Sequence, residues 1–63
     1  MSEKEHIEDA YAQIVRELFR TFFERLTAAK GNKESEAEAE EAFARGITHA
    51  RYVRERAIAA LPQ

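Results

Sequence analysis

The chain lacks cysteine and tryptophan, and it has only two glycines and one proline among its 63 residues. Without cysteine it can form neither a disulfide nor a thiolate zinc site. Glycine and proline favour turns, so their scarcity predicts few turns. A charged fraction of 35% is typical of helices rather than of a disordered tail. The composition therefore predicts a single all-α domain over residues 1–63.

Motifs that carry chemistry are also missing. There is no glycine-rich phosphate loop, and His49 has no acid three or four residues before it, as a di-iron Glu-x-x-His site would need. His6 and Asp9 share one helical face, but two ligands are fewer than the three or four that a metal site needs. We therefore expect no enzyme, no cofactor and no bound metal.

The chain also has no long hydrophobic run and no excess of basic charge. No apolar stretch approaches the ~20 residues of a membrane span, and the first six residues have no signal-peptide core. Ten basic against twelve acidic residues argue against a general nucleic-acid binder. These features predict a cytoplasmic protein with no membrane partner, for which nucleic acid is a less favoured partner.

What the chain does contain is two helical segments separated by one break, Lys30-Gly31-Asn32. Ser2 and Glu5 form the pattern of a capping box, which predicts the start of a first helix over about 3–30. Gly31 is expected to take the left-handed conformation that ends this helix. The turn covers about 31–33.

The second helix has two possible starts. Asn32 could cap it directly, or Ser35 and Glu38 could form a second capping box after a longer loop. We favour a start near Lys33 and an end near 61, because Pro62 forces its predecessor out of the α region.

Each segment carries an apolar stripe with spacings of three and four residues. On the first helix the stripe covers an arc of about 160°, which is wider than one partner helix can cover. The predicted fold is therefore an antiparallel helical hairpin of two long helices that dimerises into a four-helix bundle, with higher oligomers left open. The expected core and oligomer interface consists of Ile7, Tyr11, Ile14, Val15, Leu18, Phe19, Phe22, Phe23, Leu26, Phe43, Ile47, Ala50, Val53, Ile58 and Leu61.

Gly46 lies inside the second helix, where glycine costs about 1 kcal/mol relative to alanine. Antiparallel arms bring Leu18 or Phe19 level with Gly46, and Phe22 or Phe23 level with Phe43. We therefore predict that Gly46 is a packing notch for a bulky neighbour.

Two charged residues fall within the apolar stripes, Glu8 on the first helix and Arg54 on the second. A desolvated charge needs a partner, and the hairpin brings these two level. They are a candidate buried ion pair, within one chain or between subunits. The alternatives are an Arg54 that extends to solvent and an anion-binding site.

A second candidate surface combines basic and aromatic side chains, Arg45, His49, Tyr52 and Arg56. Such a patch can stack a base or bind an acidic strip, although a solvated helix face has the same composition. The leading functional hypothesis is a structural or regulatory protein–protein interaction module that binds itself and possibly another protein. The alternatives are an RNA- or DNA-binding bundle, and small-anion binding or catalysis in a pocket between subunits.

Overall fold

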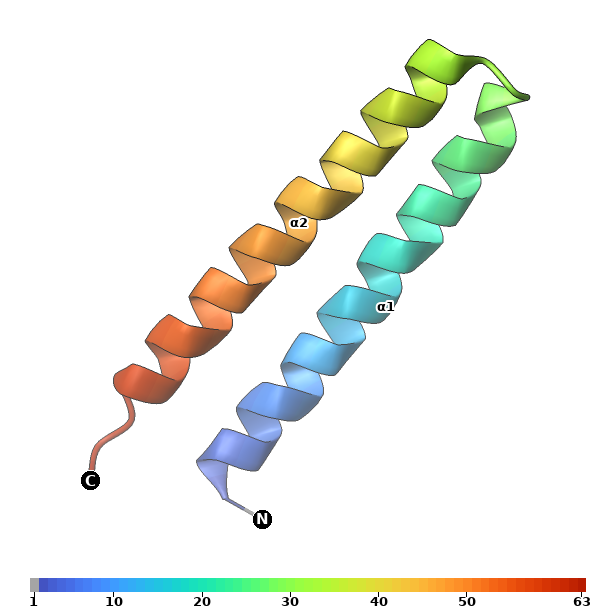
Figure 1. The fold of residues 1–63 in the computed structure, drawn as a ribbon. Helices are drawn as coiled ribbons and strands as arrows, with labels where there is room; N and C mark the ends of the chain where they lie inside the picture. Colours follow the sequence, from blue (N-terminus) through green and yellow to red (C-terminus); the bar gives the residue numbers. More distant parts are fainter. Residues whose placement is uncertain (1) are drawn as a thin grey trace.

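The computed structural model describes residues 2–63, so Met1 of the predicted domain lies outside the described residues. It contains two helices of 27 residues each, α1 (Glu3–Ala29) and α2 (Lys33–Ala59), which pack side by side and antiparallel. Both ends of the described chain lie at the same end of the molecule, away from the turn (Figure 1). The all-α helical hairpin is thus confirmed.

The start of α1 is fixed by Ser2 and Glu5. The Glu5 backbone N–H donates to the Ser2 hydroxyl oxygen at 3.2 Å, and the Ser2 backbone N–H donates to the Glu5 carboxylate at 3.4 Å. This reciprocal pair satisfies two of the N–H groups that a helix start leaves without partners. The capping box read from the sequence is therefore formed.

The turn between the helices uses two residues with positive φ. We expected the left-handed conformation at Gly31, but it begins one residue earlier, at Lys30 (φ 51°), and continues through Gly31 (φ 82°). The Asn32 backbone N–H then donates to the Ala29 carbonyl at 2.9 Å. The tight reversal needs two left-handed residues, and only one of them is a glycine.

Asn32 is the cap of α2. Its side-chain oxygen accepts from the Ser35 backbone N–H at 2.9 Å, so α2 begins at Lys33 rather than at Ser35 or Glu36. At the other end α2 stops at Ala59, two residues before the expected position. The Ala60 backbone N–H donates to the carbonyls of Arg56 (3.0 Å) and Ala57 (3.2 Å) in a final tight turn.

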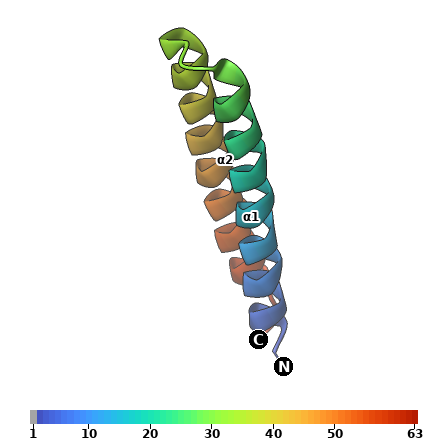
Figure 2. The same cartoon turned by 90° about the vertical axis from the view of Figure 1, so that its right-hand side faces the viewer.

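The hairpin is a single layer of two helices. Its Cα atoms extend over 50 × 18 × 7 Å, and the view along the layer shows α1 and α2 as a thin, gently curved pair (Figure 2). The radius of gyration is 14.8 Å, whereas a compact domain of this length has about 10.6 Å. A single layer can bury only the faces that the two helices turn toward each other.

Burial is correspondingly slight. Among residues 2–63 only Ala39 is buried, at 3% exposure, and it was in the expected stripe of the second helix although not among the expected core residues. The ring of Phe22 packs on Phe43 with centroids 5.0 Å apart. The five most exposed large apolar side chains, between 44% and 60%, are Ile14, Phe19, Phe23, Tyr52 and Val53.

Candidate interaction surface

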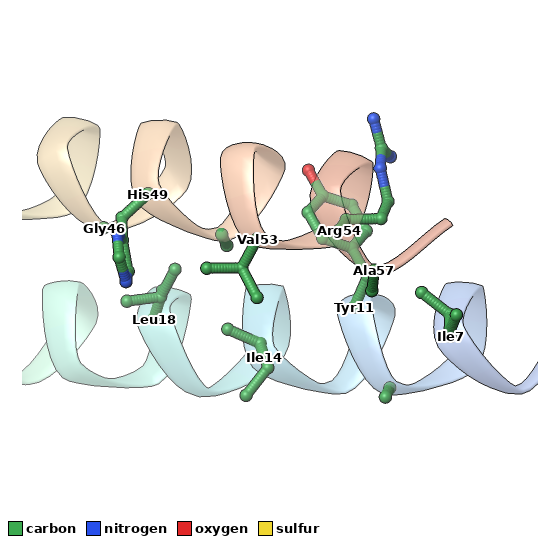
Figure 3. A pocket seen from close by; sticks show the side chains of 11 residues that line it. Ile7, Tyr11, Ile14, Leu18, Gly46, His49, Val53, Arg54 and Ala57 are labelled. Atoms are coloured by element: carbon green, nitrogen blue, oxygen red, sulfur yellow. The ribbon is translucent and has the colours of Figure 1, made fainter. Parts of the chain in front are cut away.

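One side of the hairpin is hollowed between the helices in the half that carries the chain ends. The hollow has a volume of about 530 Å³ and an almost entirely apolar wall. Figure 3 shows Ile14 and Leu18 on α1 and Val53 on α2 among the side chains that line it. The residues that line it are Ile7, Ala10, Tyr11, Ile14, Leu18, Gly46, His49, Ala50, Val53, Arg54 and Ala57.

Gly46 lies at the end of this hollow nearer the turn, directly against Leu18 (Figure 3). A Cβ atom added to Gly46 would lie 2.6 Å from Leu18 Cδ2 and 3.3 Å from Leu18 Cδ1. Such an approach is closer than carbon atoms tolerate, so the bare backbone at Gly46 makes room for the leucine. Of the two neighbours that the sequence allowed for Gly46, the structure places Leu18 there.

The hollow continues toward the turn as two smaller depressions. The first, of about 380 Å³, shares Leu18 with it and is also lined by Thr21, Phe22, Arg25, Ala39, Ala42, Phe43 and Arg45. The second, of about 310 Å³, shares Arg25 and Ala39 with the first and reaches Ser35 and Glu38. The three depressions form one furrow along this side of the hairpin, and we call it the furrow below.

Small side chains on α2 create the furrow. Ala39, Ala42, Gly46, Ala50 and Ala57 recur at helical spacing and line it from the turn to the chain ends. Small residues allow another backbone to approach closely, while Ile14 and Val53 stand at the edges with 44% and 49% exposure. The sequence analysis missed this furrow, although the spacing of these small residues was a signal for it.

The opposite side of α1 carries a second apolar feature, which we call the phenylalanine ridge. Phe19 and Phe23 are 56% and 60% exposed, and their ring centroids lie 6.4 Å apart. Nine residues separate Ile14 from Phe23, which places them about 180° apart around the helix. The wide apolar arc of the first helix is thus divided between the furrow side and the ridge side.

The structure brings Glu8 and Arg54 together. Arg54 Nη1 lies 3.7 Å from Glu8 Oε1, and the Arg54 guanidinium carbon lies 4.4 Å from the centre of the Tyr11 ring. The side chains of Arg54 and Glu8 keep 28% and 46% of their exposure, so in a single hairpin the pair is not buried. Only one neighbouring helix covers it, which leaves water access from the other side.

The basic-aromatic patch extends from the furrow edge to the outer side of α2, because His49 also lines the hollow and Arg45 also lines the depression next to it. Arg45, His49 and Tyr52 line a shallow surface depression, and the Arg56 guanidinium carbon lies 5.9 Å from the Tyr52 ring centre. Arg45 is also 3.7 Å from Glu41 on the same helix, with both side chains more than 70% exposed. Partners on α2 itself therefore already engage two of the arginines.

No family model, curated protein or solved structure matches this chain. Its function has to be inferred from its own surface.

Residues 2–63 hold no cluster of three or more histidine, aspartate or glutamate side chains placed to bind a metal ion. Neither α1 nor α2 is long and apolar enough to cross a membrane. The furrow runs along both helices of the described chain. Its half near the chain ends is apolar and flanked by exposed isoleucine and valine, and its half near the turn includes Arg25, Glu38 and Arg45.

Proposed function

We propose that this protein is a protein–protein interaction module whose first partner is a second copy of itself, and that two hairpins form a four-helix bundle. One observation carries the proposal: two well-capped helices of 27 residues bury a single alanine among residues 2–63. Apolar burial is the dominant favourable term in folding, so helices that bury so little need a further apolar surface against them.

The exposed area supports the same conclusion. The hairpin exposes 5262 Å², whereas a compact monomer of its mass exposes about 4,200 Å². A compact dimer would expose about 6,900 Å², so pairing two hairpins would bury up to about 3,600 Å² in total. Permanent homodimers commonly bury about 2,000–5,000 Å². The surface left open by one hairpin is thus of the size that a stable dimer uses.

The other candidate functions have less support. A nucleic-acid surface usually accompanies an excess of basic charge, but this chain has ten basic and twelve acidic residues, and Arg45 lies beside Glu41. The wall of the hollow of about 530 Å³ between the helices is almost wholly apolar, and the ion pair at its rim joins Glu8 to Arg54. Such a wall suits apolar side chains better than a reacting polar substrate.

Native mass spectrometry of the protein purified directly from cells tests the proposal. We expect a mass of twice 7.3 kDa, without added ligand. The midpoint of thermal unfolding should rise with protein concentration, because a dimer is stabilised by mass action. A monomer whose unfolding midpoint is independent of concentration would refute the proposal. Copurifying nucleotide mass would instead favour the nucleic-acid alternative.

A further inference from the structure

We propose that the second copy lies across the furrow with its turn at the opposite end, so that α2 of one copy runs antiparallel to α2 of the other. This inference rests on the proposed dimer and adds its face and its orientation. The furrow supplies the face, because it runs along the hairpin and is bordered by exposed Ile14 and Val53.

Charge on the furrow edge of α2 indicates the orientation. Glu38 lines the furrow near the turn, and His49 and Val53 line it in the other half. Arg56 follows Val53 by three residues and therefore lies on the same face of the helix. This edge of α2 thus carries Glu38 toward the turn, Arg45 near its middle and Arg56 toward the chain ends, and all three side chains are exposed.

An antiparallel pair of α2 helices makes the charges of Glu38 and Arg56 complementary. If the two helices cross at residue 47, Glu38 of one copy comes level with Arg56 of the other, because each is nine residues from the crossing point. Symmetry gives this pair twice. Residue 46 is the midpoint of α2 (Lys33–Ala59), so the same register also overlaps the two helices along nearly their whole length. Charge pairing and maximum burial therefore agree on one arrangement.

The alternative orientation, with both turns at one end, lacks this agreement. It would place α1 beside α2 of the other copy at the same level as within the hairpin, where Phe22 meets Phe43. Glu24 lies three residues after Thr21 on the furrow edge of α1, and it would come level with the segment from Glu38 to Glu41. Arg25, which also lines the furrow, offsets the repulsion between these acids in part, so this orientation gains no net charge pairing like that of Glu38 with Arg56.

Exchanging the two charges provides a direct test. Glu38→Arg alone and Arg56→Glu alone should each weaken the dimer about tenfold, because each creates two like-charge contacts. The double variant should recover the wild-type dissociation constant. Mixing the two single variants should give a heterodimer in preference to either homodimer, as measured by native mass spectrometry. The two positions lie about 27 Å apart in one chain, so any rescue must occur between copies.

A matched control uses the other side of α2. Glu40 and Arg51 are exposed and lie about 140° and 160° around the helix from Val53. The variants Glu40→Arg and Arg51→Glu should leave the dimer unchanged, singly and mixed. The proposed face and orientation would be wrong if Glu40 and Arg51 rescued each other, or if Glu38 and Arg56 did not. Either result would still be consistent with a dimer. A monomeric wild-type protein would instead refute both proposals.

A second measurement does not alter these charges. Because the chain contains no cysteine, Ser35→Cys with Ala60→Cys introduces its only two thiols. They lie twelve and thirteen residues from the crossing point on the furrow side, and about 37 Å apart within one chain. A short bis-maleimide should therefore link position 35 of one chain to position 60 of the other. With both turns at one end, any link would instead join position 35 to position 35 or 60 to 60, and peptide mapping of the covalent dimer distinguishes the two cases.

Discussion

The half of the hairpin next to the turn and the half next to the chain ends are built differently from the same two helices. Near the turn, the rings of Phe22 and Phe43 meet at 5.0 Å and Ala39 is buried. Near the chain ends, shorter side chains leave a hollow of about 530 Å³, and Ile14 and Val53 remain nearly half exposed. The aromatic rings span the space between the helices, and the aliphatic side chains do not.

This difference shows how each half of the hairpin is held together. In one half the turn and the aromatic pair provide contact across the layer. In the other half Arg54 contacts Glu8 and Tyr11 across the layer, and more apolar surface stays open between the helices. The following predictions test this division, beginning with the largest expected effect.

Phe22→Ala should remove the main contact of the half near the turn. We expect a loss of about 3 kcal/mol in the free energy of unfolding, measured by urea denaturation, because the aromatic contact with Phe43 is lost. The control is Phe23→Ala, on the phenylalanine ridge, which should cost less than about 0.5 kcal/mol. Equal losses would mean that the ridge is covered in the assembled protein, contrary to an interface at the furrow.

Val53→Glu should disrupt the half near the chain ends by placing a charge at the edge of the furrow. We expect the dimer to weaken by about 2 kcal/mol, or roughly 30-fold in its dissociation constant, as measured by sedimentation equilibrium. Phe19→Glu is the matched control because it adds the same charge on the ridge side. A dimer that survives Val53→Glu and dissociates with Phe19→Glu would reverse the assignment of the two sides.

Gly46→Ala tests the junction between the two halves. Overpacking against Leu18 should exceed the gain in helix propensity, so we expect a net loss of about 1 kcal/mol and a lower melting temperature. In a Leu18→Ala background, where the clash is absent, the same change should stabilise the protein by up to about 1 kcal/mol. A higher melting temperature in the wild-type background would show that Gly46 is not a packing notch.

Glu8→Gln should have the smallest effect. The Glu8–Arg54 pair is partly exposed, so its loss should cost about 0.5 kcal/mol or less at low salt and nothing measurable in 1 M salt. Thermal unfolding at both salt concentrations measures the difference. A loss above about 2 kcal/mol that salt does not reduce would mean that the assembled protein buries the pair.

Much of the hairpin follows from local sequence signals. Hydrogen bonds and backbone geometry within a few residues determine the Ser2 capping box, the Asn32 cap and the end of α2 before Pro62. These features could therefore be predicted from the sequence. The left-handed conformation predicted at Gly31 is present, but that of Lys30 was not predicted. The turn needs two positive-φ residues, and propensity identified only the glycine.

The candidate sites were less accessible to such reasoning. Antiparallel pairing of the two helices predicted that Glu8 lies near Arg54, but it did not predict how much water would reach the pair. The same pairing allowed either Leu18 or Phe19 as the neighbour of Gly46. Adjacent positions on α1 point to different sides, so only the rotation of the helix about its axis decides between them. The same rotation of α1 also determines which of its side chains line the furrow.

The sequence by itself determined that the protein is two capped helices joined by one reversal, because capping, helix propensity and apolar spacing are local properties. Only the tertiary structure decided how the wide apolar arc of α1 is divided. It turned Leu18 and Phe22 toward α2, left Ile14 on the furrow and placed Phe19 and Phe23 on the ridge. The reason is geometric: one helix covers only part of the arc, and the small residues of α2 fix which part.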